Sequence, residues 1–147
     1  MKKYLGSGVD EYNEELGLDF IFAPKEQSNE DIVVTISSPN PELTALCPAN
    51  KARDFYTWTL SYAPNKRLIE TKSLKLWFAT FANKEVYAEA LTDHIGKALA
   101  EFLEPRHLSF SMTQNLRGGM QITTDYLYQK PSSFNSPFLS ENLFVES

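Results

Sequence analysis

Hydrophobic and polar residues alternate along residues 55–62 of this chain. One side of the segment carries Tyr56, Trp58, Leu60 and Tyr62, and the other carries Phe55, Thr57, Thr59 and Ser61. This period of two predicts a β-strand with one buried face. Residues 63–66, which include Pro64 and Asn65, are expected to form the turn that ends it.

Three further segments have the composition or spacing of strands. Residues 31–37 are rich in β-branched side chains, and the run Ser38-Pro39-Asn40-Pro41 is expected to end that strand. Residues 108–112 alternate between apolar side chains and serine, which predicts another strand. After a tight turn at Arg117-Gly118-Gly119, residues 120–126 are expected to form the last strand.

Two segments between these strands have helical spacing instead. Residues 73–81 carry apolar side chains at i, i+3, i+4 and i+7, which predicts one helix. A second helix is predicted from about Lys84 to Leu103, and Pro105 stops it. Its apolar stripe consists of Val86, Tyr87, Ala90, Leu91, Ile95, Ala98, Leu99 and Phe102. The order β, β, α, α, β, β predicts an α+β fold with two helices on one face of an antiparallel sheet.

The two ends of the chain have weaker patterns. Residues 1–30 mix Gly, Asn, Pro and acidic residues and are interpreted as an arm lying on the body. The tail, residues 128–147, is rich in Ser, Pro, Asn and Phe, and is either an ordered arm at a subunit contact or a loose end. We interpret residues 1–147 as a single domain, since this length suffices for one core. The sheet has two unpaired edges, which pairing with identical subunits in a ring would remove.

Composition and charge narrow the possible functions. The net charge of -5 argues against a general nucleic-acid binder, although a few local Lys and Arg side chains can still hold a small anion. No apolar run reaches membrane-spanning length, and a single cysteine fits a reducing compartment, so the cytoplasm is the expected location. With one Cys, two separated His and no carboxylate cluster, we expect no metal site. A nicotinamide cofactor, if used, is not held by a Rossmann fold, because its glycine motif is absent.

Cys47 is the only cysteine, and Asp54 follows it seven residues later. Pro48 disfavours helical backbone at the residue before it, so Cys47 is expected in a loop. A lone cysteine is either a packed apolar thiol or a reactive thiolate. A nucleophilic cysteine needs a proton source for its product, and a carboxylic acid across a loop can supply one. The spacing alone leaves both interpretations open, because Asp54 can equally be a solvated loop residue.

Two other groups of charged residues carry possible chemistry. The run Glu70-Thr71-Lys72-Ser73-Leu74-Lys75-Leu76-Trp77 places two lysines on one side of a helix start, where phosphate is favoured. The alternative is a solvated face with Thr71 or Ser73 as the helix cap. Glu89 is expected to be partly buried beside the apolar stripe, so its carboxylate should have a partner. Either a guanine-like edge or a salt bridge to a Lys or Arg would satisfy it.

Taken together, the stretch from Leu43 to Tyr126 resembles the nitrile reductase family that converts 7-cyano-7-deazaguanine to 7-aminomethyl-7-deazaguanine. The most specific likeness is residues 70–77, close to the family's signature Glu-Ser-Lys-Ser-Leu-Lys-Leu-Tyr, which that family associates with NADPH binding. The order and spacing of four further stretches also match: Thr44-Ala45-Leu46-Cys47-Pro48, Asp54-Phe55, Glu104-Pro105-Arg106 and Arg117-Gly118-Gly119. The resemblance implies the tunnelling fold, whose β, β, α, α, β, β subunits assemble into barrel-like rings.

The resemblance also implies roles for individual residues. Cys47 would attack the nitrile carbon to give a covalent thioimide, Asp54 would donate protons, and NADPH would deliver two hydrides in succession. The substrate-binding residues would be Ile69, Glu70, Thr71, Ala88 and Glu89, with Glu89 on the pyrimidine edge of the deazapurine. The cofactor-binding residues would be Lys72, Ser73, Lys75 and Arg117. The pocket would lie between identical subunits, and the product would serve queuosine or another deazaguanine modification.

The chain departs from the family pattern at two places. The family usually has His-Glu where this chain has Ala88-Glu89, and Thr-Gly-Gln-Pro-Asp where it has Asn50-Lys51-Ala52-Arg53-Asp54. A sister group keeps the Cys and Asp but adds ammonia to the same nitrile, forming an amidine for archaeosine. That group lacks the lysine-rich signature, so we expect the reductase first and the amidine-forming enzyme second. A third alternative is a non-catalytic member that only binds deazapurines or pterins.

Overall fold

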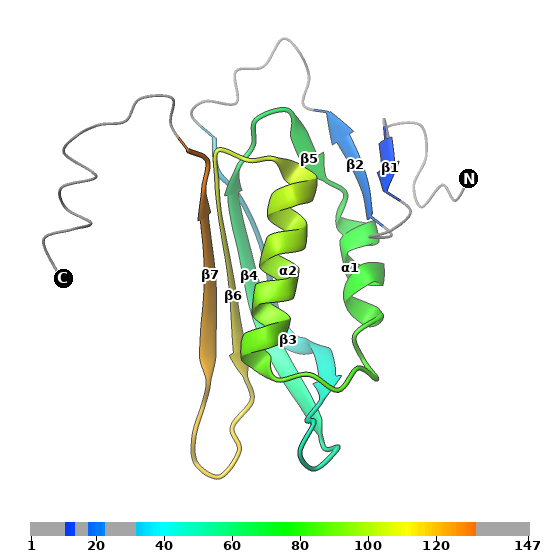
Figure 1. Cartoon of the computed structure of the whole chain (residues 1–147), viewed down its shortest axis with the longest axis vertical. Helices are drawn as coiled ribbons and strands as arrows, with labels where there is room; N and C mark the ends of the chain where they lie inside the picture. The colour runs from blue at the N-terminus through cyan, green and yellow to red at the C-terminus, as the bar shows by residue number, and fades with distance from the viewer. Residues whose placement is uncertain (1–10, 14–17, 23–31, 132–147) are drawn as a thin grey trace, which may run out of the picture.

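A four-stranded antiparallel sheet with both helices on one face forms the body of the protein (Figure 1). The computed structural model describes residues 11–13, 18–22 and 32–131. The elements are β1 (Glu11–Asn13), β2 (Leu18–Phe22), β3 (Val34–Leu46), β4 (Arg53–Ala63), β5 (Arg67–Ile69), α1 (Thr71–Ala79), α2 (Ala88–Leu103), β6 (His107–Gln114) and β7 (Thr123–Gln129). The main sheet has the order β3-β4-β6-β7, which confirms the predicted α+β class and its two open edges.

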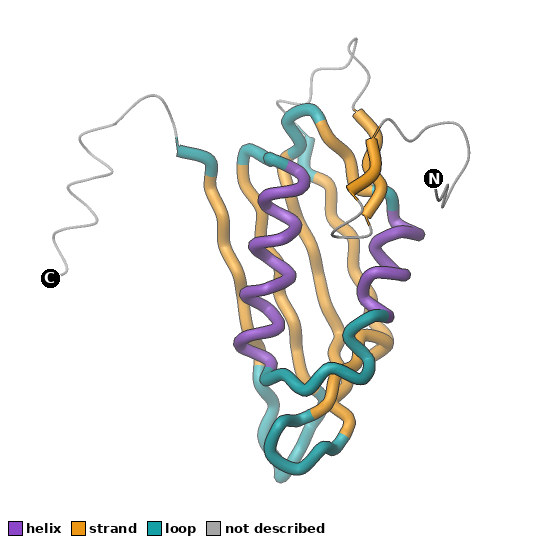
Figure 2. The backbone as a smooth tube through the Cα atoms, turned by 45° about the vertical axis from the view of Figure 1, so that its right-hand side comes forward, coloured by secondary structure: helices purple, strands orange, loops and turns teal. Residues whose placement is uncertain are grey.

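A second, smaller antiparallel sheet has the order β1-β2-β5 and stands at one end of the main sheet (Figure 2). In it, Phe20 of β2 lies opposite Ile69 of β5. This sheet was not predicted, because each of its strands is too short to show a period of two. The remaining residues of the predicted N-terminal arm, and the tail from residue 132 onwards, lie outside the described residues.

The core fills the space between the main sheet and the two helices. Its members include the predicted inward face of β4, with Tyr56, Leu60 and Tyr62 at 0%, 0% and 1% exposure. Trp58 is partly buried and packs edge-on against Phe78 of α1, with ring centroids 4.9 Å apart. The helices add mainly Leu74, Trp77, Phe78, Leu91, Ile95, Leu99, Phe102 and Leu103. Burial of each such side chain stabilises the fold by about 1.5–3 kcal/mol.

Strand β3 does not end at Ser38-Pro39-Asn40-Pro41, as the sequence analysis predicted. It continues to Leu46, and its pairing with β4 shifts register between Ser38 and Leu43. Proline is tolerated here because β3 is an edge strand, where one row of backbone groups has no partner strand to bond. The irregularity is a β-bulge, which bends a strand without ending it.

Helix α2 begins at Ala88, later than the predicted start near Lys84. The residues before it are extended, because Leu46 N donates to Lys84 O at 2.9 Å and Val86 N donates to Leu46 O at 3.0 Å. These bonds hold the entry of α2 beside the end of β3. They also place the first turn of the helix at the same end of the molecule as Cys47.

Gly96 sets how closely α2 approaches β7. A Cβ atom at this position would lie 2.2 Å from Cγ of Tyr126, a distance that real side chains do not reach. Glycine is therefore required here for close packing of the helix on the sheet.

The last strand also lies later than predicted, at Thr123–Gln129 rather than residues 120–126. The predicted tight turn does form, at Gly118-Gly119, where Arg117 and Met120 pair with each other through two backbone hydrogen bonds of 3.1 Å. Gly118 and Gly119 have positive φ angles of 60° and 77°, which glycine adopts without strain.

Candidate active site

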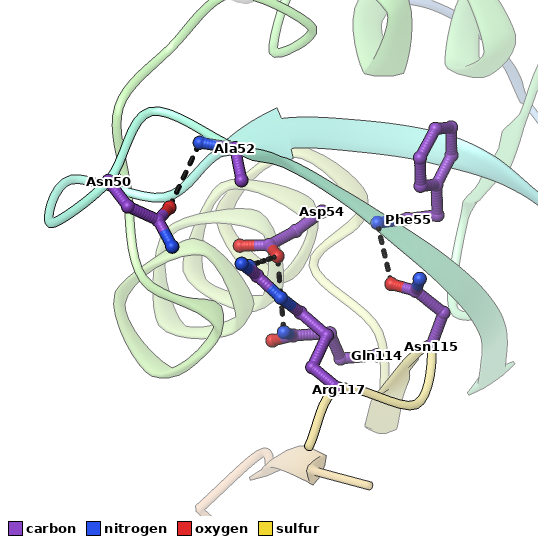
Figure 3. Close-up of polar contacts among 7 residues, drawn as sticks. All are labelled: Asn50, Ala52, Asp54, Phe55, Gln114, Asn115 and Arg117. Carbon is purple, nitrogen blue, oxygen red and sulfur yellow. Dashed lines mark hydrogen bonds and ion pairs between the residues drawn. The ribbon is translucent and has the colours of Figure 1, made fainter. Parts of the chain in front are cut away.

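Cys47 follows β3 directly and opens the turn that leads into β4. The turn is closed by two backbone hydrogen bonds of 2.8 Å, from Cys47 N to Ala52 O and from Lys51 N to Cys47 O. The side chain of Asn50 accepts a further bond from Ala52 N at 2.9 Å (Figure 3). The thiol is free and half-buried, as the prediction of a loop cysteine requires.

Two basic side chains of this turn bind it to the connection between the helices. Lys51 forms an ion pair of 2.8 Å with Glu85. Arg53 donates to Asn83 Oδ1 at 3.0 Å, to Thr44 Oγ1 at 3.1 Å and to the backbone oxygen of Ala82. The residues that depart from the family's usual loop therefore anchor the segment that carries Cys47.

Asp54 is the second residue of β4 and is 4% exposed. Its Oδ1 atom accepts a hydrogen bond from Gln114 Nε2 at 3.2 Å and forms an ion pair with Arg117 Nη1 (Figure 3). The hydrogen bond and negative charge of Asp54, and then the neighbouring Cys47, raise the pKa of Arg117 above its ordinary value. Arg117 is therefore a fixed positive charge beside both residues. The interpretation of Asp54 as a solvated loop residue is wrong.

The connection that carries Arg117 is itself held against β4. Asn115 N donates to Phe55 O at 2.9 Å, and Phe55 N donates to Asn115 Oδ1 at 3.1 Å (Figure 3). This pair of bonds fixes the end of β6 next to the residue that follows Asp54. The sequence carries no local signal for this pair of bonds, because the two partners are far apart in the chain.

Tyr56 points into the core from the same face of β4 as Asp54, and the sequence analysis assigned it no role. The residue is 0% exposed, and its hydroxyl has no hydrogen-bond partner among the described residues. Burial raises its pKa, and the charges of Asp54, Glu89 and Cys47 raise it further, while Arg117 lowers it. The charges of all four groups therefore act on this one hydroxyl. The available sequence signal was its position two residues after Asp54 on a buried face.

Glu89 lies in the first turn of α2 and is exposed, so the prediction of a partly buried carboxylate is wrong. Because the helix starts at Ala88, that residue and Leu91 face the sheet, while Glu89 faces away from it. Within the described part of the chain, its side chain makes no ion pair or hydrogen bond. It lines a shallow hollow of about 290 Å³ with Thr92 and Thr124, where a ligand edge can reach it.

Glu70 caps helix α1, a role that the sequence analysis gave to Thr71 or Ser73. Its two carboxylate oxygens accept hydrogen bonds from Lys72 N at 2.8 Å and Ser73 N at 2.7 Å. Ser73 Oγ in turn donates to Glu70 O at 2.7 Å, so this buried serine supports the cap. The helix therefore begins two residues before the predicted start at Ser73.

Two predicted substrate-binding residues, Ile69 and Glu70, lie at the opposite end of the molecule from Cys47. Ile69 N donates to the hydroxyl of Tyr62, near the end of β4, whereas Asp54 lies at its start. The strand from Asp54 to Tyr62 spans roughly 25 Å. Figure 1 shows the same separation between the β5–α1 junction and the β3–β4 turn. A single chain therefore does not bring Glu70 to Cys47.

A cleft of about 370 Å³ lies between β3 and α1. Thr71 and Lys75, two of the predicted binding residues, line it together with the aromatic rings of Trp58 and Phe78. Lys72 is exposed outside the cleft lining. Flat apolar walls with a cation at the rim suit a ligand that combines an aromatic ring with phosphate, so these residues fit part of a nicotinamide dinucleotide.

Two kinds of feature are not found in residues 11–13, 18–22 and 32–131. His, Cys, Asp and Glu side chains in these ranges form no group of three or more that could hold a metal ion. None of the helices in them is both long and apolar enough to cross a membrane.

Comparison with known proteins identifies the chain's relatives. Residues 53–133 match the family model described as "QueF-like protein". The NADPH-dependent 7-cyano-7-deazaguanine reductase of Streptococcus mutans is 35% identical over 131 residues, which cover 88% of this chain and 79% of the relative. The proteins of the same name from Exiguobacterium sibiricum and Chlorobaculum tepidum are 36% and 40% identical, over 82% and 65% of this chain and 74% and 82% of theirs.

A solved structure shares the fold. The crystal structure of the archaeosine synthase QueF-Like in its apo form superposes with a TM-score of 0.62 at 13% identity, covering 72% of this chain and all of that one. This likeness confirms the predicted tunnelling fold of the subunit. With the match of the family model and the identities to its curated members, it shows that the chain belongs to the QueF-like family of NADPH-dependent 7-cyano-7-deazaguanine reductases.

Proposed function

We propose that this protein reduces the nitrile of 7-cyano-7-deazaguanine to 7-aminomethyl-7-deazaguanine with two NADPH, in queuosine or another deazaguanine modification. The observation that carries the proposal is the grouping of a free thiol, a buried carboxylate and a guanidinium at one end of β4: Cys47, Asp54 and Arg117. A nucleophile with a neighbouring acid suits covalent capture of an electrophilic carbon.

The chemistry follows from what each residue can do. The sulfur of Cys47 forms a bond to the nitrile carbon, one carbon–nitrogen π bond breaks, and the nitrogen takes up a proton to give a thioimide. Asp54 is the acid beside that nitrogen and supplies protons as reduction proceeds. When bound, NADPH would supply the two hydrides in succession; between them the carbon–sulfur bond breaks, which returns the Cys47 thiolate and leaves an imine for the second reduction. Burial of Asp54 keeps bulk water from competing with it as the proton source.

Two further groups of residues bind the ligands in this proposal. Glu89 is exposed and free to accept two hydrogen bonds from the pyrimidine edge of the deazapurine. Lys75 at the cleft rim and the exposed Lys72 attract the cofactor phosphates, while Trp58 offers a flat face to one of its rings. Arg117 can join them only by leaving Asp54.

A complete site needs more than one chain. Glu70 and Ile69 lie at the opposite end of β4 from Cys47, so a neighbouring copy must bring them there. The main sheet offers two unpaired edges, β3 and β7, for this assembly. A closed ring of identical subunits, as the family resemblance implies, is the assembly that we propose. The acidic net charge suits a small-molecule enzyme without direct nucleic-acid contact, and the free thiol fits the cytoplasm.

One observation favours a second candidate, an enzyme that adds ammonia to the same thioimide. Ala88 begins α2 as a buried residue without a polar side-chain atom, where the family usually has histidine. Its proton-transfer path therefore differs from that of the usual reductase. The lysine-rich residues 70–77 favour the reductase between the two.

The deciding experiment follows NADPH absorbance and intact mass in the presence of 7-cyano-7-deazaguanine. We expect a one-ligand adduct and NADPH oxidation, both abolished by Cys47→Ala. An adduct that turns over with ammonium but oxidises no NADPH would establish the amidine-forming enzyme instead. Binding without any adduct in the unmodified protein would exclude covalent catalysis.

A further inference from the structure

Tyr56 has the only buried side-chain oxygen or nitrogen without a hydrogen-bond partner in the part of the chain that the structure describes. Its side chain is 0% exposed and shares a face of β4 with Asp54. An unpaired buried hydroxyl destabilises a protein, so nearly all such groups are paired. The position of this one, at the candidate active site, suggests that its partner is a ligand.

The charged groups that act on the hydroxyl come from four parts of the chain. They are Asp54 of β4, Cys47 of the turn after β3, Glu89 of α2 and Arg117 of the β6–β7 connection. Burial and the three negative or potentially negative groups raise the pKa of Tyr56, so its hydroxyl keeps its proton at physiological pH. It is therefore a hydrogen-bond donor without an acceptor.

We propose that Tyr56 is a further catalytic residue, whose hydroxyl donates a hydrogen bond to the nitrogen of the bound nitrile and of the thioimide formed on Cys47. This proposal rests on the proposed function, which supplies that nitrogen. When the sulfur–carbon bond forms, negative charge develops on the nitrogen, and a fixed donor stabilises it. Asp54 transfers the proton and Tyr56 retains its own, so the proton balance of the addition is unchanged.

A ligand reaches the hydroxyl only if a covering side chain moves, because the oxygen is closed to solvent in the free chain. Arg117 is the candidate cover: its side chain is 35% exposed, against 6% for its partner Asp54.

The test compares two probes in the full chain. In a Cys47→Ala background, which prevents the adduct, Tyr56→Phe should weaken binding of 7-cyano-7-deazaguanine about three- to tenfold. Binding of 7-deazaguanine, which has the same rings without the nitrile, should not change. With Cys47 present, Tyr56→Phe should slow adduct formation at least about tenfold. Equal effects on both probes, or no effect on the nitrile, would overturn the proposal.

A stability measurement separates this role from a structural one. Tyr56→Phe removes an unpaired polar atom and keeps the ring, so the Tm should rise by about 2–4 °C. A lower Tm would show that the hydroxyl has a structural partner, and the proposal would fail. Tyr128→Phe is the matched control: Tyr128 lies opposite Leu108, at the other end of the sheet, and its change should alter neither probe.

Failure of the proposal and failure of the proposed function give different results. If the unmodified protein binds neither probe and forms no adduct, the proposed function fails, and the proposal with it. If it forms the adduct and Tyr56→Phe forms it equally fast, only the role of Tyr56 fails.

Discussion

Tyr56 and Tyr62 lie on the same face of β4, near its two ends, and their hydroxyl groups are in opposite situations. Both side chains are buried, at 0% and 1% exposure. The hydroxyl of Tyr62 accepts a hydrogen bond of 3.0 Å from Ile69 N, and this bond ties β5 to the main sheet. The hydroxyl of Tyr56 has no partner in the described residues. At one end of the strand the buried hydroxyl is thus hydrogen-bonded within the fold, while at the other end the hydroxyl remains available for a ligand.

The ion pairs at the two ends show the same contrast. Asp54 at the site end is nearly fully buried beneath Arg117, and Gln114 also donates to it. At the other end Arg67 lies 3.4 Å from Glu104, whose side chain is 69% exposed. A buried charge depends strongly on its partners, whereas an exposed pair contributes little to stability. Residues that look alike in the sequence therefore differ in what their loss should cost.

The largest expected effect is at the site end. Asp54→Asn keeps the size of the side chain but removes its acid, so the rate of NADPH oxidation should fall about 10²- to 10⁴-fold. Steady-state absorbance with 7-cyano-7-deazaguanine measures it, with Glu104→Gln as the matched loss of one charge at the far end. A rate within about twofold of the unmodified protein would show that Asp54 is not the proton donor.

An intermediate effect is expected from Tyr62→Phe, this time on stability. The change leaves the buried amide of Ile69 unpaired, which should lower the free energy of unfolding by about 1–3 kcal/mol. Urea denaturation followed by circular dichroism measures it, with Tyr128→Phe as the control on a half-buried tyrosine. An unchanged unfolding midpoint would mean that the two ends of β4 do not differ in the way described here.

The smallest effect is expected from the exposed carboxylate of Glu104. Glu104→Gln should change the free energy of unfolding by less than about 0.5 kcal/mol, because water and salt screen this carboxylate. The same urea titration at low and high salt checks the result. A loss above about 1 kcal/mol would show that the Arg67–Glu104 pair is more than a surface contact.

The periodic segments of the fold could be predicted from the sequence, because an element with one buried face carries apolar residues at regular spacing. This holds for β4, for β6 and for the cores of both helices. The second sheet could not be predicted in this way, because strands as short as β5 show no regular spacing of apolar residues. The continuation of β3 past two prolines depends on its place at the sheet edge, which local sequence does not specify.

The site was predictable only in part. The loop position of Cys47 followed from Pro48, but Arg117 lies 63 positions from Asp54 in the chain, and their pairing depends on how β4 and β6 align. The exposure of Glu89 depended on where α2 begins. The role of Glu70 as a cap was missed because Thr71 and Ser73 are the more usual capping residues.

The bulge in β3 has a mechanical consequence for Cys47. The strand pairs with β4 as two separate ladders, Val34–Ser38 and Leu43–Leu46, and only the second leads into the turn that holds the thiol. Ladders separated in this way can open independently, as small cooperative units do in hydrogen exchange. We therefore expect the amides of residues 43–46 and those of residues 34–38 to exchange as two separate groups with different rates. Such a joint would let the nucleophile adjust to an incoming ligand while the rest of β3 keeps its pairing with β4.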